Sequence, residues 1–96
     1  MSRFDANPTF DPEDGLYHAS CDWQAVSGPA MVVVEAVATV LHADPLDLQP
    51  LQDVVDVDGV ESILTGPHTA QVTVEFEYAD TKVTLGRDGH LVIDPL

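Results

Sequence analysis

Carboxylate side chains crowd the stretch DVVDVDGVE, where their spacing is similar to that of a calcium-binding loop. Such a loop takes oxygen ligands from positions 1, 3, 5 and 12 around a glycine at position 6. If Gly59 is that glycine, Asp56 and Asp58 stand at ligand positions. Positions 1 and 12, however, are occupied by Val54 and Thr65, so two essential carboxylate ligands are missing. The sequence therefore argues against a calcium site here.

The same aspartates fit the start of a short helix better than a metal loop. Asp58 is a good N-cap residue, and Glu61 follows it three residues later, as in a capping box. Apolar residues then recur at helical spacing until Gly66-Pro67 ends the pattern. We interpret these carboxylates as helix caps and solvated surface.

Cys21 and His18 are close enough in the sequence to be tested as a nucleophile and its base. In a strand they would face opposite sides, because they are three positions apart and alternate residues share a side. The four histidines lie on separate predicted elements, without the spacing of a zinc site: His18, His42, His68 and His90. The sequence also has no glycine-rich phosphate loop and no serine nucleophile elbow. We therefore predict no enzyme, no catalytic residues, and no metal or other cofactor.

Acidic residues dominate the charge of the chain. Its 96 residues include 17 Asp and Glu against 3 Lys and Arg, which gives a formal net charge of -14. Because 45% of the residues are hydrophobic, a folded core inside an acidic shell is favoured over disorder. Self-repulsion weakens in concentrated salt, where the Debye length falls to about 3 Å near 1 M. The composition is typical of halophilic proteins, with an ordinary acidic protein as the alternative.

The length and the cysteine count indicate one small cytoplasmic domain. A chain of this size can fold alone, and the single Cys21 leaves no internal disulfide. The amino terminus has no apolar stretch of signal-peptide length, and the run AMVVVEAVATVL is too short to span a bilayer. We therefore expect a cytoplasmic protein that has no membrane partner.

Residues 1–15 mix proline, aspartate and glycine with isolated phenylalanines, and they predict a flexible acidic tail. The single folded domain is then expected over residues 16–96. Its first element is a short strand with one buried face, because apolar and polar residues alternate from Tyr17 to Trp23.

A long helix is predicted over residues 29–42, with Ser27 as its N-cap. Glu35, Thr39 and His42 fall on one narrow polar stripe, and nearly every other side chain of the helix is apolar. Such a helix needs cover on several sides. The cover comes either from a sheet and short helices of the same chain or from a partner subunit.

The carboxyl third of the chain predicts three antiparallel strands joined by a two-residue turn at Ala79-Asp80 and a loop in which Gly89 has a positive φ angle. The expected cross-strand pairs are Val74 with Leu85, Phe76 with Val83, Glu77 with Lys82, Leu85 with Leu91, and Val83 with Ile93. The sequence thus predicts an α+β fold, in which a three- to four-stranded antiparallel sheet packs on one long and one or two short helices.

Two stretches, VVEAVATVLHADPLDLQPLQDVVDVDGVESIL and VEFEYADTKVTLGRDGHLVI, resemble the halobacterial output domain family (HalOD type). The resemblance covers roughly residues 27–94. The chain departs from it at Asp80, where glycine usually follows Tyr-Ala, so the resemblance supports the hairpin but does not fix its turn type. Members of that family look like small haloarchaeal modules, found alone or fused to response-regulator receiver domains. The resemblance implies a signalling output role, and the family has no catalytic motif to transfer onto this chain.

The first functional hypothesis is a signalling output or adaptor module that acts by protein-protein interaction. Its candidate interaction surface comprises Val33, Val37 and Val40 on the long helix and Lys82 and Thr84 on the sheet. The expected partner is a receiver-domain or regulatory protein, and a homodimer remains open.

The alternative is a transcriptional regulator that contacts nucleic acid directly or through a partner. Direct contact needs cations for the phosphates, and Arg3, Lys82 and Arg87 are all that the sequence offers. The charge balance therefore argues against a nucleic-acid partner. The two hypotheses differ in whether Lys82 and Arg87 lie together on an exposed face.

Overall fold

The computed structural model of the chain describes residues 8–24, 28–66 and 71–95. In chain order its elements are β1 (Thr9–Asp11), β2 (Leu16–Ser20), α1 (Pro29–Leu41), the short 3-10 helices η1 (Pro45–Asp47) and η2 (Leu51–Asp53), α2 (Val57–Thr65), β3 (Thr73–Tyr78), β4 (Thr81–Gly86) and β5 (His90–Pro95). The five strands pair antiparallel in the order β1-β2-β5-β4-β3.

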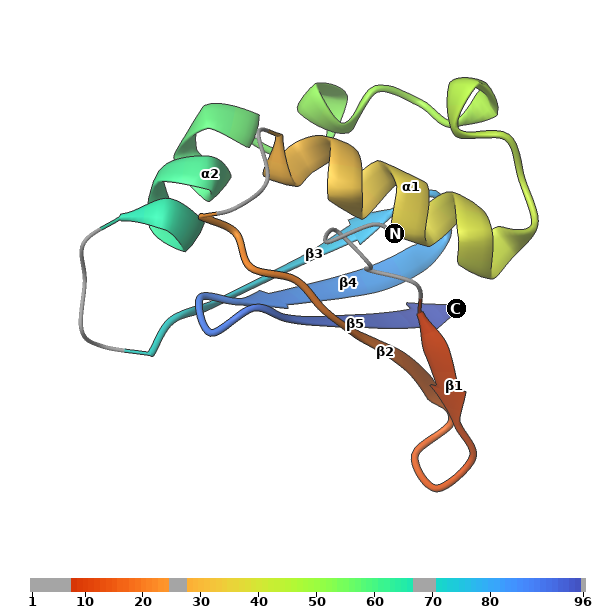
Figure 1. Cartoon of the computed structure of the whole chain (residues 1–96). Coiled ribbons are helices and arrows are strands. Elements are labelled where there is room, and N and C mark those ends of the chain that lie inside the picture. The colour runs from red at the N-terminus through yellow and green to blue at the C-terminus, as the bar shows by residue number, and fades with distance from the viewer. Residues whose placement is uncertain (1–7, 25–27, 67–70, 96) are drawn as a thin grey trace.

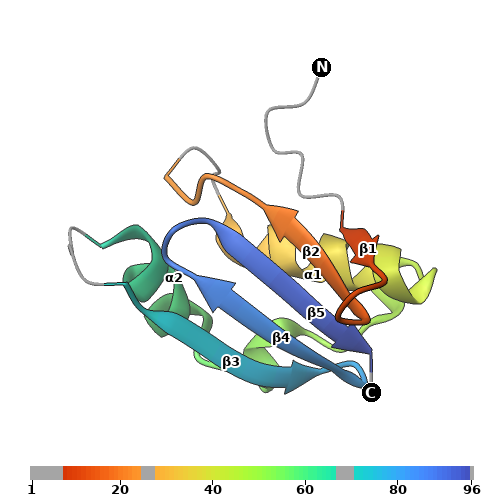
Figure 2. The ribbon, with the colours of Figure 1, turned by 90° about the horizontal axis from the view of Figure 1, so that it is seen from below.

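The helices all lie on one face of the sheet (Figure 1). Seen from below, the sheet stands in front of the helices, and no described helix covers its other face (Figure 2). We call this uncovered side the open face. The α+β class predicted from the sequence is confirmed, and the long helix and short helices are present.

The sheet has five strands rather than three or four, because β1 extends it at one edge. This strand lies within residues 1–15, which the sequence placed outside the fold as a flexible tail. The structure differs over residues 8–15, where β1 and a turn precede β2. The N–H of Gly15 donates a hydrogen bond to the carbonyl oxygen of Asp11, and this bond closes the turn. Phe10 supplies the packing, with its ring centroid 5.2 Å from that of Tyr17. Residues 1–7 lie outside the described residues.

The strand register in the carboxyl third is confirmed at every predicted pair. At the turn between β3 and β4, Ala79 and Asp80 have φ angles of 53° and 65°. Two positive φ angles in a two-residue hairpin loop are the mark of a type I′ turn. Aspartate tolerates this conformation better than most residues, so Asp80 preserves the hairpin without glycine.

The helix starts differ in part from the prediction. Asp56, rather than Asp58, caps α2, and its carboxylate accepts the N–H of Gly59 at 3.2 Å. Glu61 does not close a capping box, because its carboxylate accepts the N–H of Ala30 on α1 at 3.4 Å. The helix therefore begins two residues earlier than predicted, and Glu61 joins the two helices instead. The predicted N-cap of α1, Ser27, lies outside the described residues.

The core lies between α1 and the central strands. Val33 and Val37 of α1 face strand residues that have no exposed surface, namely Val83, Leu85, Leu91 and Ile93. Two buried rings tie loops to this core through hydrogen bonds. Trp23 donates its indole N–H to the carbonyl of Gly86 at 2.7 Å, and the Tyr78 hydroxyl donates to the carbonyl of Gln49 at 2.7 Å. Among the described residues, no buried side-chain nitrogen or oxygen lacks a partner.

Gly89 is required both by its φ angle of +99° and by the backbone of Cys21, whose carbonyl oxygen would lie 2.3 Å from a Cβ atom at this position. Gly15 has a φ angle of +74°, but a Cβ atom there would meet nothing within 4 Å.

We expect Gly15→Ala to lower the free energy of unfolding by about 1–2 kcal/mol, the cost of a left-handed conformation. Gly89→Ala should lower it clearly more, because the added methyl also displaces backbone.

Urea unfolding of both variants in multimolar potassium chloride, followed by tryptophan fluorescence, measures the difference. Equal losses in the two variants would contradict the proposed backbone clash at Gly89.

Candidate functional site

The three valines predicted to form an interaction surface on the long helix are buried. Val33, Val37 and Val40 have exposed fractions of 1%, 0% and 7%. They belong to the core, so this part of the predicted surface is wrong. The reason is that the sheet, the 3-10 helices and α2 already cover α1 on several sides.

The exposed side of α1 is the polar stripe that the sequence identified. Glu35, Thr39 and His42 are exposed, and Met31 extends the stripe by one turn with 59% of its surface exposed. This solvent-facing stripe is narrow, and one methionine is its main apolar feature. Intramolecular cover is therefore the better of the two explanations for the apolar helix.

Lys82 and Thr84 lie on the open face. Their neighbours on β4, Thr81, Val83 and Leu85, point toward the helices, and alternate residues of a strand point to opposite sides. The Lys82 ammonium lies 3.4 Å from the Glu75 carboxylate on β3, and the Thr84 hydroxyl donates to the same carboxylate at 3.5 Å. Both residues are half-buried, so the structure leaves this second part of the candidate surface accessible.

Lys82 and Arg87 do not lie together. Lys82 points to the open face, whereas the Arg87 guanidinium donates from Nε to the carbonyl of Ile63 on α2, in the helix layer. The two cations thus act on opposite sides of the sheet. A phosphate-binding patch needs clustered cations, so this arrangement does not favour direct contact with nucleic acid.

One cleft of about 510 Å³ opens beside the loop between β4 and β5. Trp23, Arg87 and Asp88 line it. The indole of Trp23 and the guanidinium of Arg87 both donate hydrogen bonds to backbone carbonyls, at 2.7 and 2.8 Å. These polar groups are engaged in holding the loop and α2 in place.

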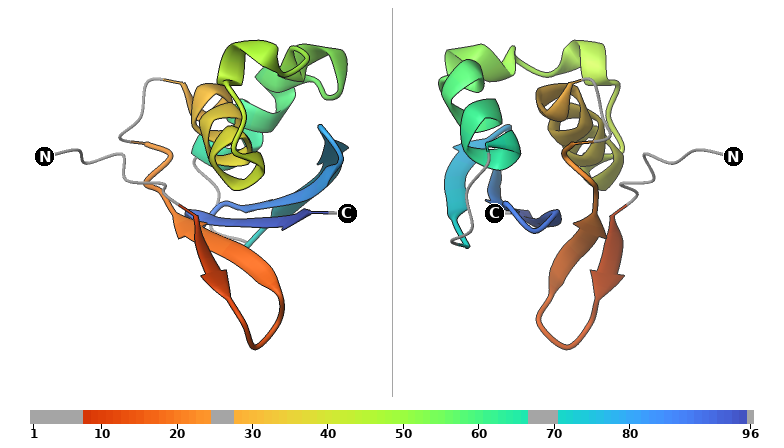
Figure 3. Two further views of the ribbon diagram at one scale, coloured as in Figure 1. Left: turned by 90° about the vertical axis from the view of Figure 1, so that its right-hand side faces the viewer. Right: turned by 60° about the vertical axis from the view of Figure 1, so that its left-hand side comes forward.

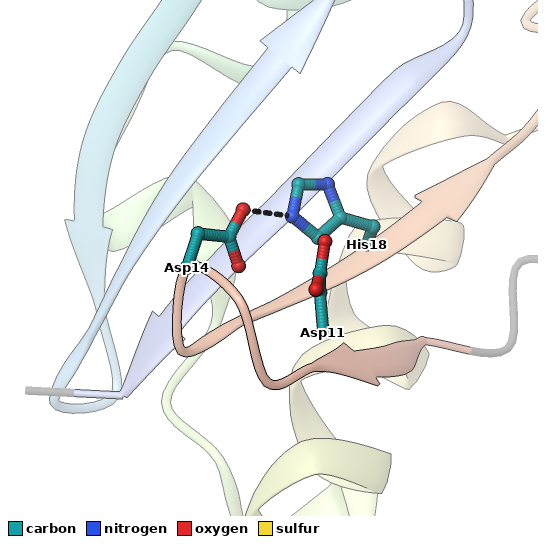
Figure 4. Close-up of side chains that lie close together, drawn as sticks. All are labelled: Asp11, Asp14 and His18. Carbon is teal, nitrogen blue, oxygen red and sulfur yellow. Dashed lines mark hydrogen bonds and ion pairs between the residues drawn. The ribbon is translucent and has the colours of Figure 1, made fainter.

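A cluster of titratable side chains lies on the β1–β2 hairpin. His18 Nε2 is 2.7 Å from Asp14 Oδ2, and Asp11 lies beside them, so that one ligand atom from each residue falls within 4.8 Å of the others (Figure 4). On its other side His18 Nδ1 is 3.3 Å from Nε2 of His90 on β5. We call Asp11, Asp14, His18 and His90 the histidine cluster.

The sequence argument treated the histidines as isolated because they lie on separate elements. The fold corrects this for two of them, since β2 pairs with β5 and brings residues 72 positions apart into contact. The sequence signal for the carboxylates was the spacing of Asp11, Asp14 and His18 around a turn containing Gly15. Assigning Asp11 and Asp14 to a tail hid that signal. His68 lies outside the described residues.

Comparison with known protein families identifies the chain. The family described as halobacterial output domain 1 matches residues 27–95, which is most of the sequence. The chain belongs to the halobacterial output domain 1 family. The resemblance recognised in the sequence is thereby confirmed, and it includes every element from α1 to β5. The β1–β2 hairpin lies ahead of the matched residues.

No curated protein and no solved structure matches this output domain. Among the described residues, no helix has the length and apolar character needed to cross a membrane.

The burial of Val37 can be tested against the exposure of Met31 on the same helix. Val37→Asp should lower the free energy of unfolding by about 3–5 kcal/mol, the cost of an uncompensated buried charge. Met31→Asp should change it by no more than about 0.5 kcal/mol, as expected of an exposed position. Urea denaturation of both variants is the measurement. If Val37→Asp unfolded no more easily than Met31→Asp, Val37 would lie on the surface after all.

The pKa of Asp14 is a test of the hairpin geometry. The backbone N–H of Leu16 is the main group that lowers this pKa below its ordinary value of 3.8, and His18 lowers it further. A lowered pKa in the folded state stabilises the hairpin above pH 3.8, and this contribution is lost as the pH falls through the folded value. Carbon NMR of the Asp14 carboxyl should show a titration below 3.8 that moves upward in His18→Gln. A midpoint at or above 3.8 in the native chain would contradict these contacts.

Proposed function

We propose that this chain is a small halophilic signalling output module that acts by binding another protein, through the open face of its sheet. The observation that carries the proposal is that the described helices cover only one face of the sheet. Membership of a family described as an output domain supports the signalling role. The high acidic charge suits a salt-rich cytoplasm, which is where we place the module.

The open face offers a row of side chains that crosses four strands. His18 of β2, Val92 of β5, Thr84 of β4 and Glu75 of β3 are cross-strand neighbours in the register. Val92 and Thr84 are half-buried near the middle of the row, and Lys82 stands beside it. Val92 is the one apolar residue of this row, and its neighbours are polar or charged. A transient protein interface is, as a whole, no more apolar than the rest of a protein surface.

The partner that we favour is a receiver-domain or other regulatory protein. The open face carries Glu75 next to its lysine, and Arg87 is directed to the helix layer, so nucleic acid is the less favoured partner. The proposal includes no catalysis. Cys21 is buried, and burial raises the pKa of its thiol, which keeps it in the unreactive protonated form.

Capture of partners from a haloarchaeal lysate in multimolar potassium chloride, with identification of proteins and nucleic acids, supplies the ligand for the test. We expect Thr84→Arg to weaken binding of the captured protein at least tenfold, because the longer charged side chain stands in the middle of the open face. Met31→Arg, which places the same side chain on the exposed stripe of α1, should leave the affinity unchanged. Calorimetric titration measures both dissociation constants.

Weakening by Met31→Arg alone would move the contact to the helix layer and contradict the open face. Recovery of specific DNA without a protein would contradict the whole proposal and favour the transcriptional regulator. Sedimentation of the purified chain shows whether the open face binds a second copy of the chain instead of a different protein. If the chain is a homodimer through this face, Thr84→Arg should sediment as a monomer.

A further inference from the structure

The β1–β2 hairpin gathers three side chains that can act together as metal ligands. Asp11 ends β1, Asp14 lies in the turn, and His18 lies in β2 (Figure 4). Their nearest ligand atoms all lie within 4.8 Å of one another. An octahedral cation with ligands at about 2.1 Å holds neighbouring ligand atoms roughly 3–4 Å apart, so small side-chain movements would suffice to enclose one.

The hairpin backbone holds the carboxylates in position before any ligand arrives. Asp11 Oδ1 accepts the N–H of Glu13 at 2.9 Å, and Asp14 Oδ1 accepts the N–H of Leu16 at 2.9 Å. The other oxygen of Asp14 faces His18 Nε2. The hairpin projects beyond the rest of the sheet (Figure 3), and 31% of the His18 side chain and 41% of the Asp14 side chain are exposed. A hydrated ion can therefore reach these atoms.

His90 lies on β5 and is not one of the three proposed ligands, but it contacts one of them. Its Nε2 atom lies 3.3 Å from His18 Nδ1. With a cation on Nε2 of a neutral His18 ring, the ring proton sits on Nδ1 and donates to His90 Nε2. Metal-binding histidines are commonly oriented by such a hydrogen bond from the other ring nitrogen.

From this geometry we infer that Asp11, Asp14 and His18 bind a divalent transition-metal ion, with His90 as a positioning residue. Two carboxylates and one imidazole form a mixed oxygen and nitrogen donor set, which suits Mn²⁺ or Zn²⁺ better than the all-oxygen preference of Ca²⁺. The bound ion would hold the two strands of the hairpin together, and the hydrogen bond from His18 to His90 would link its site to β5. The ion site shares His18 with the open face, but it rests on the hairpin geometry alone and its test uses no protein partner.

The test uses the full chain labelled with ¹⁵N and titrated with Mn²⁺ in multimolar potassium chloride. Calorimetry gives the affinity, and paramagnetic broadening of the amide signals gives the location. We expect binding of one ion per chain, with the strongest broadening around Asp14 and His18. Asp14→Asn and His18→Gln should each weaken binding at least tenfold.

Glu13→Gln is the matched control, because it removes one negative charge from the same turn at an exposed residue outside the cluster. It should leave the affinity within about twofold. His90→Ala should weaken binding about tenfold, as loss of an orienting partner does, without changing the stability of the ion-free chain. His90→Gln should restore binding, since its amide oxygen can accept the same hydrogen bond.

Absence of binding at millimolar Mn²⁺ would overturn the site and leave His18 and Asp14 as a hydrogen-bonded pair. Equal weakening by Glu13→Gln and Asp14→Asn would also overturn it, because the ion would then be attracted by the acidic surface in general. The hairpin amide signals of each ion-free variant verify that the turn is intact. If Asp14→Asn opens the turn, the test rests on His18→Gln: unchanged Mn²⁺ affinity in that variant would overturn the site.

Discussion

The packing of α1 against the two central strands is the contact on which the rest of the structure depends. Val37 of α1 and Val83, Leu85, Leu91 and Ile93 of β4 and β5 have no exposed surface. Burying a side chain of this kind contributes about 1.5–3 kcal/mol, and these contacts must offset the self-repulsion of a chain with a net charge of -14. The flanking strands β2 and β3 pair directly onto β5 and β4, so they too depend on this packing.

This central contact also decides which surfaces remain available. Because the helices occupy one side of the sheet, the open face is the broad surface on which neighbouring strands display side chains together. The outer side of α1 instead presents a narrow polar stripe with Met31 at its start. The apolar helix thus belongs to the core, and the proposed partner-binding surface is on the sheet.

The β1–β2 hairpin extends the sheet with residues that precede the family-matched part of the chain. The family match begins after it, yet β2 continues the same sheet through its pairing with β5. The hairpin therefore brings side chains from before the matched region next to a histidine within it. The structural consequence is the contact between His18 and His90, which neither segment could form alone.

The sequence by itself determined the features that depend on short-range order. The register of β3, β4 and β5 followed from the alternation of Val74, Phe76 and their partners around a two-residue turn. The polar stripe of α1 followed in the same way from its helical period. These patterns are local, since each strand or helix repeats its own geometry along a few residues.

Only the tertiary structure decided which apolar side chains were covered and which distant residues met. Val33 and Val40 could not be assigned to the core from α1 alone, because a helix that is apolar around its circumference does not indicate which side its neighbours occupy. The three residues of β1 carry too weak a pattern to predict a strand, and they are ordered by pairing with β2. The proximity of His18 and His90 arises from strand pairing across 72 positions, and such long-range pairing leaves no periodic signal in the local sequence.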